Sequence, residues 1–438
     1  MRFFICLFAL FSRLHLSQGT GEATTLSAIL EGGVSSRVYP GAVAMAGRGD
    51  RLLFAHSAGR LSYPGDREGL FAPMTLSSVF DVASLSKVLA TTSAVAWLYQ
   101  RGLLDLDSRV MEYLGPSFSS GGKADITLRH CLLHNSGLAP DPDPWYWDAS
   151  FGCRNTPHEQ PEEDFSCLGS MIYYSLMSES VLSTPGEEYV YSDLGFITLS
   201  FVVGKVALQE GLVGHEEFLP RCRDSRYGEQ DAVRMQCAFE AFVRTHVFGR
   251  LSSASSQQTL RTAIDTAAGS PGGPRGGWMP HTQYLPPQQL WSSCAPTLND
   301  TGDGSYTHKR LQGQVADGDC YAMGGIAGHA GVFSTAGDIG LFLAYMLTAP
   351  ESDAESFINA STIEHFTSIY NVSQSSRALG WTTNSNEAKD YGYDHSCGSM
   401  HEDTFMHTGY TGTCMCADPV SGLWSVILTT RYLCLAFI

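Results

Sequence analysis

The sequence contains little charge, and its basic residues are fewer than its acidic ones. Of 438 residues, 27 are Lys or Arg and 44 are Asp or Glu, so the formal net charge is −17 and charged residues make up only 16%. No run rich in Lys and Arg is present that could neutralise nucleic-acid phosphates. The composition therefore argues against a nucleic-acid partner, whereas 43% apolar residues are enough for the core of a large globular protein.

Long hydrophobic runs are also missing. No stretch reaches the roughly 20 apolar residues that a bilayer span requires, so we expect no stable membrane insertion. The apolar run Phe3–Phe11 turns polar at Ser12, which is typical of a signal-peptide core, and small residues for cleavage lie near Ser17 or Gly19. We therefore expect residues 1–19 to be a signal peptide that leads to the secretory pathway or the extracellular space. A buried N-terminal segment is the alternative.

Several signatures of known enzyme classes are absent. The sequence has no C-x-x-C or H-E-x-x-H metal motif, no P-loop, no G-x-G-x-x-G fingerprint and no G-x-S-x-G elbow. These absences disfavour a metallohydrolase, a nucleotide enzyme and a lipase of the elbow type. We predict no metal and no cofactor.

Twelve cysteines are present. Cys153 and Cys167 flank a polar loop, and Cys222 and Cys237 flank a charged segment, so each pair fits a disulfide in an oxidising compartment. Scattered buried thiols explain the same pattern equally well.

Local patterns predict a succession of helices and antiparallel strands. A helix and a strand hairpin are expected over about residues 26–61, and a helix begins at or beside Ser84. Residues 252–310 are rich in Ser, Gly, Pro and Gln, which predicts a loop-rich insertion. Turns divide the end of the chain into three expected antiparallel strands, which cover residues 404–413, 414–418 and 423–430.

The first chemical motif is the S-x-x-K sequence formed by Ser84 and Lys87 at the predicted helix start. A spacing of three places both side chains on one helix face, where a lysine can approach and activate a serine hydroxyl. Ser120 and Lys123 also match this pattern, but they lie in a glycine-rich loop with no helix to fix their geometry. We interpret the second copy as a decoy.

Two further elements follow in the chain order that this chemistry expects. Tyr191-Ser192-Asp193 comes after a Pro-Gly turn and precedes a predicted helix, and His407-Thr408-Gly409 lies on a predicted strand. A rival Tyr-x-Asp, Tyr146-Trp147-Asp148, lies in proline-rich surroundings that indicate an aromatic loop cluster.

With these blocks, the sequence resembles the class C β-lactamase-like serine hydrolases, which include penicillin-binding proteins, D-amino-acid peptidases and carboxylesterases. The resemblance spans about residues 25–433. Its blocks are Tyr39–Ala42, Asp81–Lys87, Ile126–Leu138, Thr184–Glu187, Tyr191–Asp193, Gly324–Thr335 and His407–Thr413.

The resemblance implies an α/β fold of the α+β type, in which an antiparallel sheet flanked by helices packs against a mainly helical region. We expect one β-lactamase-related domain over residues 25–433. Its sheet part would comprise about residues 25–100 and 320–433, and its helical part about residues 101–319, including the insertion.

The resemblance also implies an acyl-enzyme mechanism. Ser84 would attack a carbonyl, Lys87 and Tyr191 would move its proton, and the backbone N–H groups of Ser84 and Tyr410 would bind the oxyanion. Asp193, His407, Thr408, Gly409 and Tyr410 would contact the substrate, which we expect to be a small ester, amide or peptide. The alternative is a penicillin-binding-like or catalytically weak binding protein of the same fold. The oligomeric state is not indicated.

Two substitutions depart from the family pattern. Asp193 replaces a frequent asparagine, and as a carboxylate it would hold Lys87 charged. We therefore expect Tyr191 to supply more of the general base, because a nearby cation lowers the pKa of a tyrosine. His407 replaces a frequent lysine and would be only partly protonated near neutrality, which favours esters or small amides over β-lactams.

Three other histidines, His130, His134 and His329, are expected to be structural rather than ligating or catalytic. Family members usually continue past the last strand into a helix that packs on the sheet, whereas this sequence ends at the apolar Leu433–Ile438. One sheet face would then need cover from the N-terminal helix, from a partner chain or from sequence missing at this end.

Overall fold

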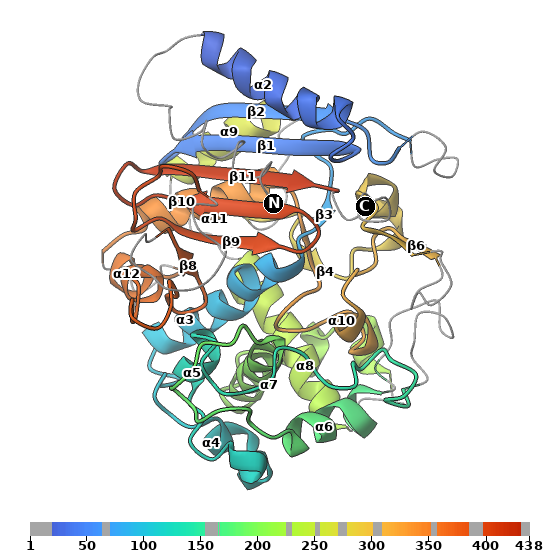
Figure 1. Cartoon of the computed structure of the whole chain (residues 1–438), viewed down its shortest axis with the longest axis vertical. Helices are drawn as coiled ribbons and strands as arrows, with labels where there is room; N and C mark the ends of the chain where they lie inside the picture. The colour runs from blue at the N-terminus through green and yellow to red at the C-terminus, as the bar shows by residue number, and fades with distance from the viewer. Residues whose placement is uncertain are drawn as a thin grey trace.

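Two regions make up the described chain: a sheet packed between helices, and a helical region below it (Figure 1). The computed structural model describes residues 20–63, 71–153, 165, 167–224, 230–249, 255–269, 278–300, 309–351, 357–384 and 397–430. The expected signal peptide, residues 1–19, lies outside these ranges. Within them, no helix has the length and apolarity needed to cross a bilayer.

The main sheet of the described residues has six strands in the order β2-β1-β11-β10-β9-β8, and every neighbouring pair is antiparallel. The prediction of an N-terminal hairpin and three antiparallel strands at the end of the chain is confirmed. The strands are β1 (Gly41–Arg48), β2 (Arg51–Gly59), β8 (Thr382–Thr383), β9 (Phe405–Gly409), β10 (Thr413–Ala417) and β11 (Leu423–Thr429).

Helices cover both faces of this sheet. Helix α2 (Thr20–Ser35) places Leu26 and Leu30 against one face, in a cluster that includes Ile427. Helix α11 (Ala336–Thr348), which begins at the N-cap Thr335 as its sequence predicts, packs on the opposite face and joins the larger core. The N-terminal helix α2 thus covers one face of the sheet, which was the first of the three possibilities that the sequence suggested.

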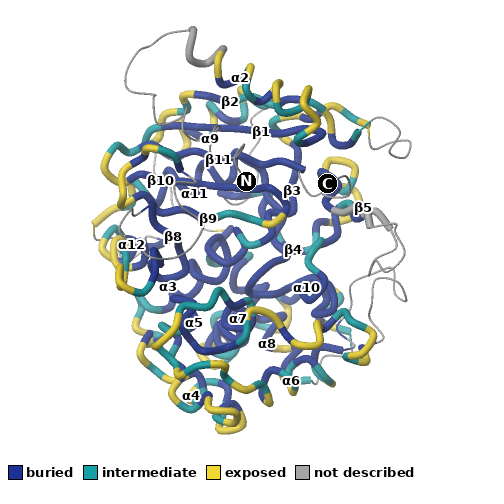
Figure 2. The backbone as a smooth tube through the Cα atoms, viewed as in Figure 1, coloured by how far each residue is buried: buried dark blue, intermediate teal, exposed yellow. Residues whose placement is uncertain are grey.

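The helical region is built from short segments around α7 (Asp193–Gln209), whose residues from Leu194 to Gly204 are all buried. Figure 2 shows this buried centre in dark blue, with exposed residues gathered at the periphery. The other helices are α4 (Val110–Leu114), η3 (Pro116–Gly122), α5 (Leu128–Leu132), η4 (Leu168–Ile172), α6 (Tyr173–Ser178), η5 (His215–Glu217), η6 (Pro220–Arg223), α8 (Asp231–Phe242) and η7 (Val243–Phe248).

Between the two regions runs a helical segment that starts beside Ser84. It consists of η1 (Ala83–Leu85), the π-helical turn η2 (Lys87–Thr92) and α3 (Ser93–Gln100). Short elements connect it to the rest of the fold: β3 (Phe80–Asp81), β4 (Gln283–Tyr284) and β7 (Val332–Ser334) form one small sheet, and β5 (Leu298–Asp300) and β6 (Lys309–Leu311) another. The remaining helices are η8 (Gln288–Ser293), α10 (Gly318–Ala322) and α12 (Ala360–Thr367).

The prediction of a loop-rich insertion over residues 252–310 is wrong for its first part. Helix α9 (Ser255–Ala267) occupies thirteen of these residues. Leu260 and Ile264, four residues apart, are buried on its inner face. The segment is rich in Ser, Thr and Gln, so its composition did not reveal that these two apolar residues form one face of a helix.

Disulfides join both predicted pairs, Cys153–Cys167 and Cys222–Cys237. A third disulfide, Cys397–Cys416, was not predicted. It ties β10 to the segment before β9 on the sheet face that α2 covers. Four described cysteines lie outside these disulfides, and all four are buried thiols: Cys131, Cys294, Cys320 and Cys414.

Candidate active site

The backbone turns sharply just before Ser84. Ala83 has a positive φ of 48°, an unfavourable conformation for a residue with a side chain. The carboxylate of Asp81 accepts the N–H groups of Ala83 at 2.9 Å and Ala316 at 2.8 Å, which holds the turn in place. Burial raises the pKa of Asp81 to about 6 despite these two bonds. A strained turn of this kind places Ser84, half-buried, at the entrance of the helical segment.

Lys87 lies at the centre of a buried polar network. Its ammonium donates to Ser84 Oγ at 3.0 Å and to the carbonyl of His329 at 3.2 Å, and it lies 2.7 Å from Asp193 Oδ1. Burial alone would lower the pKa of Lys87, but Asp193 and then Tyr191 raise it above its ordinary value. Lys87 is therefore held as an ammonium ion by Asp193, as the sequence predicted.

Tyr191 lies beside this pair, and two cations face its ring. Lys87 Nζ is 4.8 Å from the ring centroid and the guanidinium of Arg377 is 5.3 Å from it. Hydrogen bonds from Lys87 and Ser84 reach its side chain, but burial outweighs them and raises the pKa of Tyr191 above its ordinary value. The expectation of a lowered pKa is wrong in its net direction, because the sequence could show the cation but not the loss of water.

His134 packs against the ring of Tyr191. The two rings stack with centroids 4.3 Å apart, and His134 Nδ1 accepts the N–H of Ser192 at 3.0 Å. Burial and the neighbouring cations lower the pKa of His134 well below its ordinary value. His130 Nδ1 caps α5 by accepting the N–H of Thr127. The structural roles predicted for these two histidines are confirmed.

The β9–β10 turn is fastened to the backbone just before Ser84. Thr411 Oγ1 donates to the carbonyl of Asp81 at 2.8 Å, and Thr413 Oγ1 donates to that of Val82 at 3.0 Å. A Cβ on Gly409 would lie 2.5 Å from the Val82 carbonyl oxygen, so only glycine fits there. This contact brings Tyr410 to the Ser84 turn, where its side chain is 71% exposed.

His407 is buried on β9, the long strand nearest the helical region (Figure 1). Its Nδ1 donates to the carbonyl of Thr408 at 2.8 Å, while its buried Nε2 has no hydrogen-bond partner in the described part of the chain. Burial, followed by Arg377 and Lys87, lowers its pKa well below the ordinary value. The expectation of partial protonation is thus wrong, and His407 is neutral. Because side chains alternate along a strand, the Thr408 side chain lies on the other face of the sheet from that of His407. Thr408 pairs with Cys414 of β10.

Arg377 was missed by sequence reasoning, because it lies in no motif and 30 residues before His407. Its Nε donates to the hydroxyl of Tyr189 at 3.1 Å, and its buried Nη1 has no hydrogen-bond partner within the described ranges. Among the described residues, no acidic side chain forms an ion pair with it. A guanidinium is always charged, so Arg377 brings an unbalanced positive charge to the side of the site formed by β9.

His329, which was expected to be structural, lies within the candidate site, where its carbonyl accepts from Lys87. Its Nε2 and Asp317 Oδ1 are 2.9 Å apart. Burial would lower the pKa of His329, but Asp317 and then Asp193 raise it above its ordinary value. Asp141 lies nearby, and burial, followed by Asp193 and Asp317, raises its pKa.

Asp193, Asp317 and His329 also form a group with metal-binding potential, since their ligand atoms lie within 4.8 Å of one another. Within the described residues, Lys87 already pairs with Asp193 and His329 with Asp317.

The block Gly324–Thr335 owes its glycines to tight packing between helices. Thr91 Oγ1 donates to the carbonyl of Gly328 at 2.7 Å, and Ser86 Oγ accepts the N–H of Val332 at 3.1 Å. A Cβ on Gly328 would lie 2.0 Å from the carbonyl oxygen of Phe196 in α7. The block therefore sets the spacing between Lys87 and the start of α7.

The two rival motifs have structural partners. Lys123 is fully buried and donates to the carbonyls of Met177 and Glu179, so it stabilises the end of α6. Tyr146 is buried, and its N–H donates to Asp319 Oδ1 at 2.6 Å. These contacts support the interpretation of Ser120 and Lys123 as a decoy and of Tyr146–Asp148 as part of a structural loop cluster.

Comparison with known proteins gives the family. The Beta-lactamase family model matches residues 26–433. The chain belongs to the β-lactamase family. A putative D-alanyl-D-alanine carboxypeptidase of Escherichia coli (strain K12) is 26% identical over 364 residues, which cover 82% of this chain and 70% of that protein. The N-acetylmuramyl-L-alanine amidase of Bacillus subtilis (strain 168) is 25% identical over 411 residues, covering 90% and 77%.

Solved structures share the fold of this β-lactamase family member. The class C β-lactamase from Rhodobacter sphaeroides superposes with a TM-score of 0.53 at 17% identity, over 92% of this chain and 93% of that chain. The predicted fold class, an antiparallel sheet with helices and a helical region, is confirmed.

Proposed function

We propose that the protein is a serine hydrolase that acts through an acyl-enzyme on a small ester, amide or peptide. The observation that carries this proposal is the 3.0 Å contact between Lys87 Nζ and Ser84 Oγ at the end of a strained turn. Tyr191 and Asp193 face the same pair, which gives the serine both a proton route and a fixed orientation.

In the proposed reaction, Ser84 Oγ attacks the substrate carbonyl and loses its proton to Tyr191. The base form of Tyr191 is a phenolate, which Lys87 and Arg377 favour and burial opposes. The proton then passes to the leaving group, and water releases the acyl group in a second step with the same residues. The N–H groups of Ser84 and Tyr410 would hold the oxyanion; losing one such donor typically costs about 3 kcal/mol.

The substrate class is proposed from the relatives and from the charges of the site. The relatives named above are a carboxypeptidase and an amidase, both of which cleave amide bonds. Neutral His407 provides no cation for a substrate carboxylate at its own position, which supports small amides and esters over β-lactams. The positive charge on this side of the site comes from Arg377, whose Nε donates to Tyr189. Asp193, as an acceptor, would orient a substrate N–H, and the backbone of Thr408 and Gly409, together with Tyr410, would line the edge of β9, because the Thr408 side chain lies on the other face of the sheet.

Hydrolysis of a short-chain p-nitrophenyl ester tests the proposal. Wild type, Ser84→Ala and the decoy variant Ser120→Ala are compared under the same conditions. We expect hydrolysis to disappear in Ser84→Ala and to persist in Ser120→Ala. Equal rates in wild type and Ser84→Ala would refute the assignment of the nucleophile.

A catalytically weak, penicillin-binding-like protein is the second candidate. It is favoured by one observation: Lys87 is charged and Tyr191 is neutral in the free site, so the base form is scarce. Pre-steady-state kinetics separate the two functions. A burst of p-nitrophenol followed by negligible turnover would identify a binding protein, whereas sustained turnover identifies the hydrolase.

We further propose that the protein enters the secretory pathway. Three disulfides among the described cysteines support an oxidising compartment, since cytosolic reductants keep most thiols reduced. Expression with and without residues 1–19, followed by N-terminal sequencing of the exported protein, tests the cleavage expected there.

A further inference from the structure

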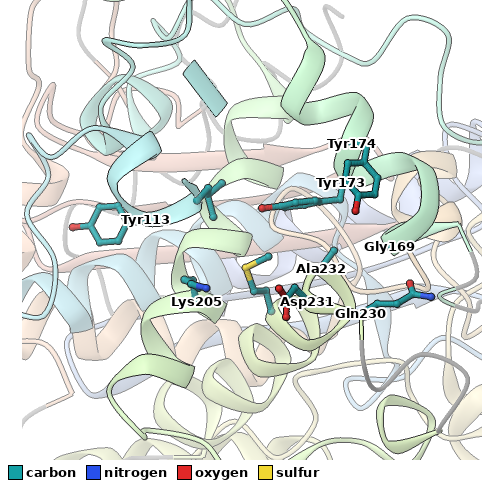
Figure 3. A pocket seen from close by; sticks show the side chains of 10 residues that line it. Tyr113, Gly169, Tyr173, Tyr174, Lys205, Gln230, Asp231 and Ala232 are labelled. Atoms are coloured by element: carbon teal, nitrogen blue, oxygen red, sulfur yellow. The ribbon is translucent and has the colours of Figure 1, made fainter. Parts of the chain in front are cut away.

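A cavity lies in the helical region, away from Ser84. Its volume is about 390 Å³, which is in the lower part of the range of small-molecule sites. Figure 3 shows its side chains, which come from several helices. Lys205 lies twelve residues after Asp193 on α7, about 18 Å along the helix at 1.5 Å per residue. The lining residues are Tyr113, Leu114, Gly169, Tyr173, Tyr174, Lys205, Gln230, Asp231, Ala232 and Met235.

Two opposite charges face this cavity without pairing. Lys205 on α7 is half-buried, and Asp231 is the first residue of α8. Neither forms an ion pair or a hydrogen bond through its side chain within the described ranges, although both line the same space. Their charges cancel, so the cavity offers no net attraction to a simple anion or a simple cation. A ligand with one charge of each sign would satisfy both.

Gln230 adds an unused acceptor. Among the described residues, its buried Oε1 has no hydrogen-bond partner. It lies against Gly169, where a Cβ would be 1.9 Å from this oxygen. A buried acceptor without a donor is costly, and a ligand N–H group reached by rotation of the amide would remove that cost.

Tyrosine rings complete the side of the cavity that suits a cation. Tyr173 and Tyr174 are adjacent on α6, with ring centroids 6.1 Å apart in an edge-on arrangement. Figure 3 shows both rings on the side where Gln230 lies, whereas Lys205 lies on the side of Tyr113. Ring faces attract ammonium groups, and a lysine attracts a carboxylate.

We propose that this cavity binds a small zwitterion of the amino-acid or short-peptide class. The ligand's carboxylate pairs with Lys205, and its ammonium group lies among Asp231, Gln230 and the tyrosine rings. This site is separate from the catalytic residues, so its occupancy does not depend on the function proposed for Ser84.

Calorimetric titration of the purified full chain tests the proposal. The probes are alanine and alanyl-alanine as zwitterions, acetate and methylamine as single-charge fragments, and glucose as a neutral polar molecule. All titrations use the Ser84→Ala variant, so that hydrolysis of the dipeptide does not contribute heat. We expect saturable binding of a zwitterion at least ten times tighter than that of either fragment, and no saturation with glucose.

Matched variants show where the probe binds. We expect Lys205→Met and Asp231→Asn each to weaken binding at least tenfold. Arg234→Met removes an exposed charge from the same helix α8 outside the cavity, and binding should be unchanged. Gly169→Ala displaces the Gln230 amide and should weaken binding without changing any charge.

Three results would overturn the proposal. These are the absence of saturable zwitterion binding, binding that survives both Lys205→Met and Asp231→Asn, and equal affinities for alanine and acetate. Circular dichroism of each variant confirms folding, and a variant that unfolds is replaced by Lys205→Gln or Asp231→Ser. Loss of ester hydrolysis alone has no bearing on this site.

Discussion

The two sides of the candidate active site differ in how their charges are balanced. On the side formed by α7, α10 and the Gly324–Thr335 block, charged groups occur in pairs: Lys87 with Asp193, and His329 with Asp317. On the side formed by β9 and the segment before β8, His407 is neutral and Arg377 has no acidic partner in the described chain. On the paired side, neighbouring acidic and basic groups can exchange protons. On the unpaired side, buried side-chain nitrogens lack hydrogen-bond partners among the described residues.

The largest effect is expected from breaking the central pair. Lys87→Met removes the cation that contacts Ser84 and leaves Asp193 without its partner. We expect kcat/KM for an ester to fall at least about 10³-fold and the free energy of unfolding to fall by about 3 kcal/mol. Lys123→Met is the control: it should destabilise the fold but leave the activity of the folded fraction unchanged. Equal activity losses in both variants would contradict the account.

Tyr191→Phe tests the proposed base while keeping the ring that contacts His134, Lys87 and Arg377. We expect kcat to fall about 10²-fold or more, with little change in stability, because only the hydroxyl is lost. Rapid-mixing measurement of acylation checks this prediction. Acylation at the wild-type rate would remove Tyr191 from the role of base.

Asp193→Asn changes the charge balance without changing the shape of the side chain. Asp193 raises the pKa of both Lys87 and Tyr191, so its neutralisation should lower both. If activity requires the loss of one proton from Lys87 or Tyr191, the midpoint of the pH profile should fall by roughly 1–3 pH units. The pH profile of kcat/KM measures the shift; an unchanged or raised midpoint would show that Asp193 does not control the pair.

On the unpaired side, Arg377→Met removes the second cation that faces Tyr191. Because that cation favours the phenolate, we expect activity to fall about tenfold and the midpoint of the pH profile to rise. Arg377→Lys keeps the charge and should recover part of the loss. A purely structural role for Arg377 would lower stability in both variants and leave the midpoint where it was.

The smallest effect on activity is expected from Asp319→Asn. Burial and Asp317 raise the pKa of Asp319 to about 8, so the folded state binds its proton more tightly than the unfolded chain does. The stability that this proton provides is fully present below about pH 4 and is lost as the pH rises through about 8. We expect this decline to be smaller in Asp319→Asn, as measured by chemical unfolding between pH 5 and 9. Identical slopes in the two proteins would contradict it.

Sequence reasoning found the residues that lie in local motifs. Ser84 and Lys87 share a helix face, and Tyr191 and Asp193 flank the N-cap of α7, so short spacings carried this information. The three strands at the end of the chain could also be predicted, because turn residues separate segments with the residue pattern of strands.

Charge states and distant partners could not be predicted in this way. The pKa directions of Tyr191 and His407 depend on burial by segments far along the chain, and their local sequences do not record it. Arg377 reaches Tyr191 across 186 positions, and its surrounding sequence has no motif. The third disulfide was missed for the same reason, since only the fold brings Cys397 beside Cys416.

The most direct test is the mass of the protein during the reaction. Wild type and Ser84→Ala are mixed with p-nitrophenyl acetate, quenched with acid within the first turnover and analysed as intact and digested protein. The account predicts one acetyl group per wild-type molecule, located on the peptide that contains Ser84, and none in the variant. An acetyl group on another residue, or turnover with no adduct on Ser84, would contradict it.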